Sequence, residues 1–92
     1  MRVGLLGAGR IGNVHAQAIS SHPESELVAV SDAFEKNAQA LARSHGCEVR
    51  TSDEIIADSS IDAVLIATST DTHSDLIEAA TAAGKAVLCE KP

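Results

Sequence analysis

The sequence has almost no aromatic residues and little positive charge. Its 92 residues include one phenylalanine, no tryptophan and no tyrosine, so any core has to be built from valine, isoleucine, leucine and alanine. Seven lysines and arginines stand against 13 aspartates and glutamates, which gives a formal net charge of −6. Nucleic acids are bound by basic surfaces, so this charge argues against a nucleic-acid partner.

Long apolar runs, a secretion signal and metal-binding cysteines are also missing. No apolar run approaches the roughly 20 residues that a membrane-spanning helix needs, and the chain enters its first apolar segment at Arg2 without a signal-peptide pattern. Cys47 and Cys89 lack the spacing of metal ligands, and we expect both to be reduced thiols, with Cys89 packed in a strand. These features predict a cytoplasmic protein with no membrane partner and no metal site.

Four short apolar runs and one short polar segment, at residues 48–50, alternate with segments of helical periodicity. We expect strands at residues 2–6, 27–31, 48–50, 63–67 and 86–89. Apolar strands between amphipathic helices indicate a parallel sheet covered on both faces. Because crossovers between parallel strands are right-handed, the expected strand order is 3-2-1-4-5. The predicted fold class is therefore α/β, a Rossmann-type doubly wound parallel sheet, with residues 1–92 forming one domain.

The helices between these strands are predicted from apolar stripes and end signals. The expected buried residues are Ile11, Val14, Ala18 and Ile19 in the first helix, Phe34, Ala38, Leu41 and Ala42 in the second, and Leu76, Ile77 and Ala80 in the last. The expected end signals are His22-Pro23, Gly46 and Gly84. A short helical turn is expected at residues 53–57, and residues 72–75 have the pattern of a capping box.

The first strand runs directly into a glycine-rich motif. Gly7-Ala8-Gly9-Arg10-Ile11-Gly12 follows the strand at once and opens the first helix, and Asp32 stands twenty residues after Gly12 at the end of the second strand. Strand, turn, helix and acid together form a dinucleotide-binding fingerprint. Gly7 would permit the tight turn, Gly9 would let a pyrophosphate approach the backbone, and Gly12 would let the helix pack against the sheet. Asp32 would accept hydrogen bonds from ribose hydroxyls.

Two further segments should reach the same edge of the sheet, at the carboxyl ends of strands four and five. The first is the hydroxyl-rich stretch at residues 67–73, which can cap the following helix, contact a cofactor, or do both. The second is Glu90-Lys91-Pro92, which on its own could be a solvated strand exit.

Among the histidines, His15 should be packed under the first helix, and His22 and His45 should end helices.

Together these segments resemble the Gfo/Idh/MocA family of NAD(P)-dependent sugar and polyol oxidoreductases. The resemblance spans the whole chain and rests on GAGRIGNVHA at residues 7–16, VAVSDA at 28–33, ATSTDTH at 67–73 and AGKAVLCEKP at 83–92. Within the family the chain looks most like dehydrogenases that act on inositol. The resemblance implies NAD as cofactor, with Lys91 as catalytic residue. The implied cofactor-binding residues are Gly7, Gly9, Arg10, Ile11, Gly12, Asp32, Thr68, Ser69, Thr70, His73 and Glu90.

The family also implies a second domain. The 92 residues would be the N-terminal dinucleotide-binding domain, cut off after strand five, and a C-terminal domain would supply the rest of the polyol or sugar site and the interface of a homo-oligomer, expected to be a tetramer. The family's catalytic aspartate and histidine would lie in that second domain, so no histidine of this chain is assigned to catalysis. One departure is Ser69, which stands where the family often has proline.

Two other functions fit parts of the pattern. A non-catalytic dinucleotide sensor would share the glycine motif but would not need Lys91 at the edge of the sheet. A domain that binds S-adenosylmethionine would also place an acid after strand two, but the full G-x-G-x-x-G spacing and the loop after strand four argue against it. Titration with NAD and with S-adenosylmethionine would separate a dinucleotide-binding domain from this last alternative.

Overall fold

The computed structural model describes residues 1–67 and 73–89. Its strands are β1 (Arg2–Leu6), β2 (Glu26–Ser31), β3 (Glu48–Val49), β4 (Ala63–Ile66) and β5 (Ala86–Cys89), and its helices are α1 (Arg10–Ser21), α2 (Glu35–His45), α3 (Ser52–Ala57) and α4 (His73–Ala82). The strands form one sheet in the order β3-β2-β1-β4-β5, and every pair is parallel. The predicted fold class and strand order are therefore confirmed.

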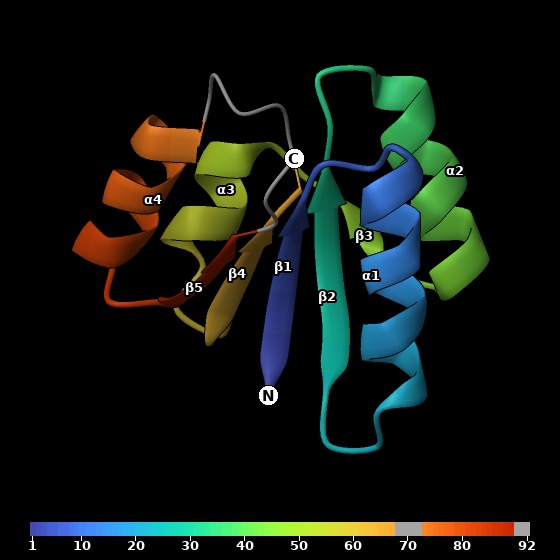
Figure 1. Ribbon diagram of the computed structural model, residues 1–92, viewed down its shortest axis with the longest axis horizontal. Helices are drawn as coiled ribbons and strands as arrows, with labels where there is room; N and C mark the ends of the chain where they lie inside the picture. The colour runs from blue at the N-terminus through green and yellow to red at the C-terminus, as the bar shows by residue number, and fades with distance from the viewer. Residues whose placement is uncertain (68–72, 90–92) are drawn as a thin grey trace.

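Helices cover both faces of the sheet (Figure 1). Helices α1 and α2 lie on one face, and α3 and α4 lie on the other. Successive residues of β4 alternate between the faces, because Leu65 packs with α2 residues while Val64 and Ile66 pack with residues of α3 and α4. Both faces are built from aliphatic side chains, as the composition requires. The strands in Figure 1 run toward one edge of the sheet, where the chain leaves β1 and β2.

Helix α1 packs on the sheet through its small residues. Gly12 and Ala16 are buried, whereas Ile11 and Val14 are 46% and 59% exposed and Ala18 is exposed too. The predicted buried face was therefore wrong except at Ile19, which is partly buried against the core. The reason is distance, because a β-carbon added to Gly12 would lie 2.1 Å from the carbonyl oxygen of Gly7. A contact this close admits only small residues, so the larger ones point away.

Helix α2 begins one residue after Phe34, which is the N-cap and is 72% exposed. The prediction that Phe34 belongs to the buried stripe was therefore wrong, while Ala38, Leu41 and Ala42 are buried as predicted. A cap residue lies before the helix takes up its regular rotation, so helical spacing does not decide where its side chain points. The helix ends at Gly46 in the left-handed conformation, with φ +69°, as predicted.

Side-chain hydrogen bonds stabilise the start of α3 and connect the segment after α3 to the residue before β5. A capping box opens α3: the Glu54 N–H donates to Thr51 Oγ1 at 3.1 Å, and the Thr51 N–H donates to Glu54 Oε1 at 3.0 Å. Hydrogen bonds from the backbone and the side chain of Thr51 lower the pKa of the Glu54 carboxyl. Lys85 Nζ donates to the carbonyls of Asp58 and Ile61 at 2.6 and 2.8 Å, which ties the segment after α3 to the start of β5.

Helix α4 turns Ala80 fully inward and leaves Leu76 and Ile77 partly buried, and Gly84 follows it with φ +79°. The capping box predicted at residues 72–75 begins outside the described residues. None of the four helices, as far as they are described, is long and apolar enough to cross a membrane.

Candidate functional site

A pocket of about 630 Å³ lies at the carboxyl ends of the strands. Its walls come from the turn after β1, the end of β2 with the start of α2, the start of α3, the residue after β4, and α4. The lining residues are Gly7, Gly9, Ser31, Asp32, Ala33, Phe34, Asn37, Thr51, Ser52, Ala67 and Leu76. This is the edge at which doubly wound sheets bind ligands, and it is where the sequence places its fingerprint.

The glycine turn has the backbone geometry that its sequence predicts. Gly7 has φ +112°, a conformation that side chains rarely adopt, and its N–H donates to the Ser31 carbonyl at 2.7 Å. A β-carbon on Gly9 would meet nothing within 4 Å, whereas one on Gly12 would collide with Gly7. The turn is therefore open to a ligand at Gly9 and closed against the sheet at Gly12.

The start of α1 presents backbone N–H donors to this opening. Gly9 is the N-cap and has no side chain to accept a bond from the first helical turn, and that turn holds no acidic residue. The first N–H groups of a helix have no partner within the helix, and together with the positive end of the helix dipole they favour an anion. Arg10 and Ile11 begin the helix and are exposed. The open turn at Gly9 and the backbone donors of the first turn of α1 are suited to bind a diphosphate group.

Asp32 lies half-buried between the turn and α2. Its Oδ2 accepts the Ala8 N–H at 2.6 Å, and its Oδ1 accepts the Phe34 N–H at 2.8 Å. Sequence reasoning placed Asp32 beside a ribose, and the structure adds that the carboxylate also holds the glycine turn. Each carboxylate oxygen has a second lone pair, so both remain able to accept bonds from hydroxyl groups.

Asn13 takes part in the same turn and was missed by the sequence analysis. Its Nδ2 donates to the carbonyls of Gly9 and Ala8, at 2.9 and 3.1 Å. The Ala8 backbone is therefore held at both ends, by Asp32 at its N–H and by Asn13 at its carbonyl. The signal available in the sequence was position, because an amide four residues after Gly9 can reach back to the turn along one helix face.

Ser31 and Ser52 connect two walls of the pocket and were also missed. Ser31 is 5% exposed, and its Oγ lies 2.9 Å from Ser52 Oγ at the start of α3. A serine that ends an apolar strand, with a serine after the next strand, was the available signal.

Several predicted site residues lie outside the described residues, namely Thr68, Ser69, Thr70, Glu90 and Lys91. His73 is the first residue of α4, and its side chain is likewise outside the description. Their proposed contacts with a cofactor or substrate remain predictions. Of the other predicted residues, Gly7, Gly9 and Asp32 line the pocket. Gly12 does not line it but packs closely against Gly7.

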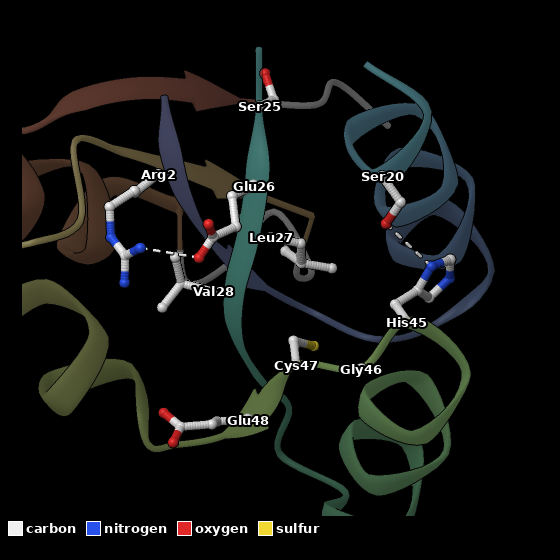
Figure 2. Close-up of a pocket in the computed structure, with 10 residues that line it drawn as sticks. All are labelled: Arg2, Ser20, Ser25, Glu26, Leu27, Val28, His45, Gly46, Cys47 and Glu48. Carbon is white, nitrogen blue, oxygen red and sulfur yellow. Dashed lines mark hydrogen bonds and ion pairs between the residues drawn. The ribbon is translucent and has the colours of Figure 1, made fainter. Parts of the chain in front are cut away.

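A second pocket, of about 490 Å³, lies at the opposite, amino ends of the strands (Figure 2). Arg2 Nη1 lies 2.9 Å from Glu26 Oε2 in an ion pair, and Ser20 Oγ lies 3.2 Å from His45 Nδ1. Arg2, Glu26 and His45 thus have partners within the pocket, and Glu48 forms an ion pair with Arg50. The Cys47 thiol is free and half-buried, and burial raises its pKa, which makes it a poor nucleophile. Among the described residues at this end of the sheet there is no counterpart of the glycine turn.

Within residues 1–67 and 73–89 no group of three or more histidine, cysteine, aspartate or glutamate side chains is arranged to hold a metal ion. The histidines expected to end helices do so, with His22 as the cap of α1 and His45 as the last residue of α2. His15 is half-buried.

A parallel sheet in this order, with a glycine turn under a helix N-terminus and an acid at the end of β2, defines a dinucleotide-binding domain of the Rossmann class. The family model described as "Oxidoreductase family, NAD-binding Rossmann fold" matches residues 1–92. The chain belongs to this Gfo/Idh/MocA oxidoreductase family and is its NAD-binding domain. Membership in an oxidoreductase family does not favour the alternative of a dinucleotide sensor.

Three similar proteins illustrate the relationship. Inositol 2-dehydrogenase from Rhizobium meliloti (strain 1021) is 61% identical over 92 residues, which are 100% of this chain and 28% of the relative. The crystal structure of a myo-inositol dehydrogenase from Corynebacterium glutamicum superposes with a TM-score of 0.94 at 46% identity, covering 100% of this chain and 28% of that one. GenD2 from gentamicin A biosynthesis, solved in complex with NAD, gives a TM-score of 0.96 at 36% identity, with coverage of 100% and 27%. The chain thus spans little more than a quarter of the length of these proteins.

Proposed function

We propose that the protein containing this domain is an NAD-dependent dehydrogenase that oxidises a secondary hydroxyl of a cyclic polyol. The proposed reaction converts myo-inositol to 2-keto-myo-inositol. The substrate is proposed from the relatives, since an inositol 2-dehydrogenase is 61% identical to the whole chain. The bound nicotinamide would supply the hydride acceptor, and the residues of this domain would bind and orient it.

The observation that carries the proposal is the shared hydrogen-bond network of the glycine turn and Asp32. The turn is open at Gly9, the first turn of α1 offers donors, and the Asp32 carboxylate lies against Ala8. In this proposal the backbone from Gly9 to Gly12, including Arg10 and Ile11, holds the pyrophosphate, and Asp32 accepts the adenosine ribose hydroxyls. A carboxylate at this position would repel a ribose phosphate, so NAD is favoured over NADP.

The nicotinamide end is assigned to the loop after β4 and the exit of β5. Thr68, Ser69, Thr70, His73 and Glu90 are proposed to contact the cofactor, and Lys91 is proposed to orient the substrate hydroxyl and assist its proton transfer. These roles follow from the family resemblance of the two segments. A second domain that closes the substrate site, a homotetramer and a cytoplasmic location complete the proposal.

The test is NADH formation by the purified protein, followed by absorbance, with myo-inositol, scyllo-inositol and glucose as separate substrates. We expect NAD-dependent oxidation of myo-inositol and a much smaller rate with NADP. NADH production from glucose but from neither inositol would reassign the substrate within the same reaction class. Cofactor binding without oxidation of any polyol would contradict the proposed activity and leave only the cofactor-binding role.

A further inference from the structure

Phe34 is the single aromatic residue of the chain, and it is not used in the core. It is 72% exposed, the highest exposure among the large apolar side chains that the structure describes. Burial of a phenylalanine side chain stabilises a fold, so a fold short of aromatic residues would gain by burying it. Of the exposed large apolar residues in the described ranges, Phe34 is also the one that lines the pocket at the carboxyl edge.

The backbone of Phe34 is fixed beside Asp32. Its N–H donates to Asp32 Oδ1 at 2.8 Å, and its carbonyl accepts the N–H groups of Asn37 and Ala38 at 3.0 and 3.4 Å. As the N-cap of α2 it therefore presents its ring from a rigid position rather than from a loose loop. A ring on a fixed backbone is ordered at low entropic cost when a ligand covers it.

The order of groups along the pocket indicates what would cover the ring. Asp32 is hydrogen-bonded to Ala8 of the glycine turn through Oδ2 and to Phe34 through Oδ1, so the acid lies between the turn and Phe34. Asn37 and the start of α3 line the same pocket. If the pyrophosphate binds at the turn and the adenosine ribose at Asp32, as in the proposed function, the base attached to that ribose extends toward Phe34. A purine has two flat faces, and aromatic side chains stack on such faces irrespective of the hydrogen bonds at the edges of the base.

We propose that Phe34 is the stacking platform for the adenine base of the bound dinucleotide. This inference rests on the proposed function for the position of the ribose and adds a binding residue to it. It accounts for the exposure of Phe34, for its fixed backbone and for its place beside the ribose-binding acid.

The test compares Phe34→Ala, Phe34→Trp and Val14→Ala in the purified protein. Val14 is a matched control because it is also an exposed apolar residue, at 59%, and does not line the pocket. Dissociation constants are measured for NADH by fluorescence titration and for ADP-ribose by competition. Aromatic–base stacking predicts a loss of about 5- to 150-fold in affinity for Phe34→Ala, of equal size for both ligands, because both contain adenosine. Phe34→Trp should bind within a few-fold of the wild type, and Val14→Ala should be unchanged.

The outcomes separate this inference from the function on which it rests. If the wild type binds neither NADH nor ADP-ribose, the proposed cofactor site itself is wrong. If the wild type binds both and Phe34→Ala binds them equally well, the stacking platform is refuted while the cofactor site stands. A Phe34→Ala protein with normal affinities but altered self-association in sedimentation experiments would also overturn the inference, because the ring would then cover a protein surface.

Discussion

The two glycines Gly9 and Gly12 give a sharp test, because the structure assigns them opposite consequences. In Gly12→Ala the new β-carbon would lie 2.1 Å from the Gly7 carbonyl oxygen and 2.8 Å from its carbonyl carbon. Both atoms belong to the backbone, so no side chain can rotate away. The helix would have to withdraw from the sheet by more than about 1 Å to restore ordinary contact.

The sign of this effect depends on two opposing terms. Replacing glycine by alanine within a helix usually stabilises it by up to about 1 kcal/mol. Forcing an extra methyl group into a filled contact costs about 1–3 kcal/mol, and sometimes more. Because the clash at Gly12 is with immobile backbone, we expect the second term to dominate and the unfolding free energy to fall by about 1–2 kcal/mol. In Gly9→Ala the new β-carbon meets nothing within 4 Å, and the unfolding free energy should stay within about 0.5 kcal/mol of the wild type.

The assays are urea unfolding followed by circular dichroism and NADH titration. Gly12→Ala should lower the unfolding midpoint and weaken binding together, since the turn and helix move as one unit. Gly9→Val should unfold like the wild type and lose most of its NADH affinity, because its side chain would occupy the space in front of the turn. Wild-type stability in Gly12→Ala would refute the packing argument, and wild-type affinity in Gly9→Val would refute the phosphate assignment.

Charged groups give three more predictions. Asp32→Asn should reduce the preference for NADH over NADPH by at least tenfold in titrations, since a carboxylate about 5 Å from a doubly charged phosphate repels it by roughly 2 kcal/mol; an unchanged ratio would contradict this. Hydrogen bonds from Ser60 and Arg50 lower the pKa of Asp58 from 3.8 to about 2, so the carboxylate stabilises the domain above about pH 4 and this contribution is lost as the pH falls toward 2. Asp58→Asn should therefore flatten the fall of the urea midpoint over this range, and an unaltered pH profile would count against the assignment. Lys91→Ala should lower kcat by about 100- to 10,000-fold with little change in NAD affinity, and near-normal turnover would show that Lys91 is not catalytic.

Strand order and the glycine turn could be predicted because each depends on a strong local pattern. Four apolar runs and a short third strand, separated by helices, leave few topologies once crossover handedness is fixed. The spacing of Gly7, Gly9 and Gly12 specifies one turn geometry, and the structure has the expected positive φ at Gly7 and close contact at Gly12. The helix end at Gly46 was predictable for the same reason.

The errors arose where periodicity ranks residues by hydrophobicity alone. On α1 the branched residues Ile11 and Val14 have the stronger hydrophobic signal, yet Gly12 and Ala16 form the contact because the helix lies so close to the sheet. Phe34 was assigned to a buried stripe because it has the spacing of one, although the helix starts a residue later. Asn13 had only its position, four residues after Gly9, as a signal, because its bonds depend on carbonyl directions that the folded turn defines.

The hydrogen bonds around Ala8 have a thermodynamic consequence for cofactor binding. Bonds from Asn13 to two carbonyls, and from the Ala8 N–H to Asp32, close the turn through the protein's own groups. The entropy of ordering this segment is therefore lost during folding rather than during association, and the site is preorganised. If the side chain of Asn13 or of Asp32 were removed, the turn would lose this conformational entropy when the cofactor binds. In calorimetry, a cofactor that meets a loosened turn should bind with a less favourable entropy, even where the remaining contacts keep the enthalpy nearly unchanged.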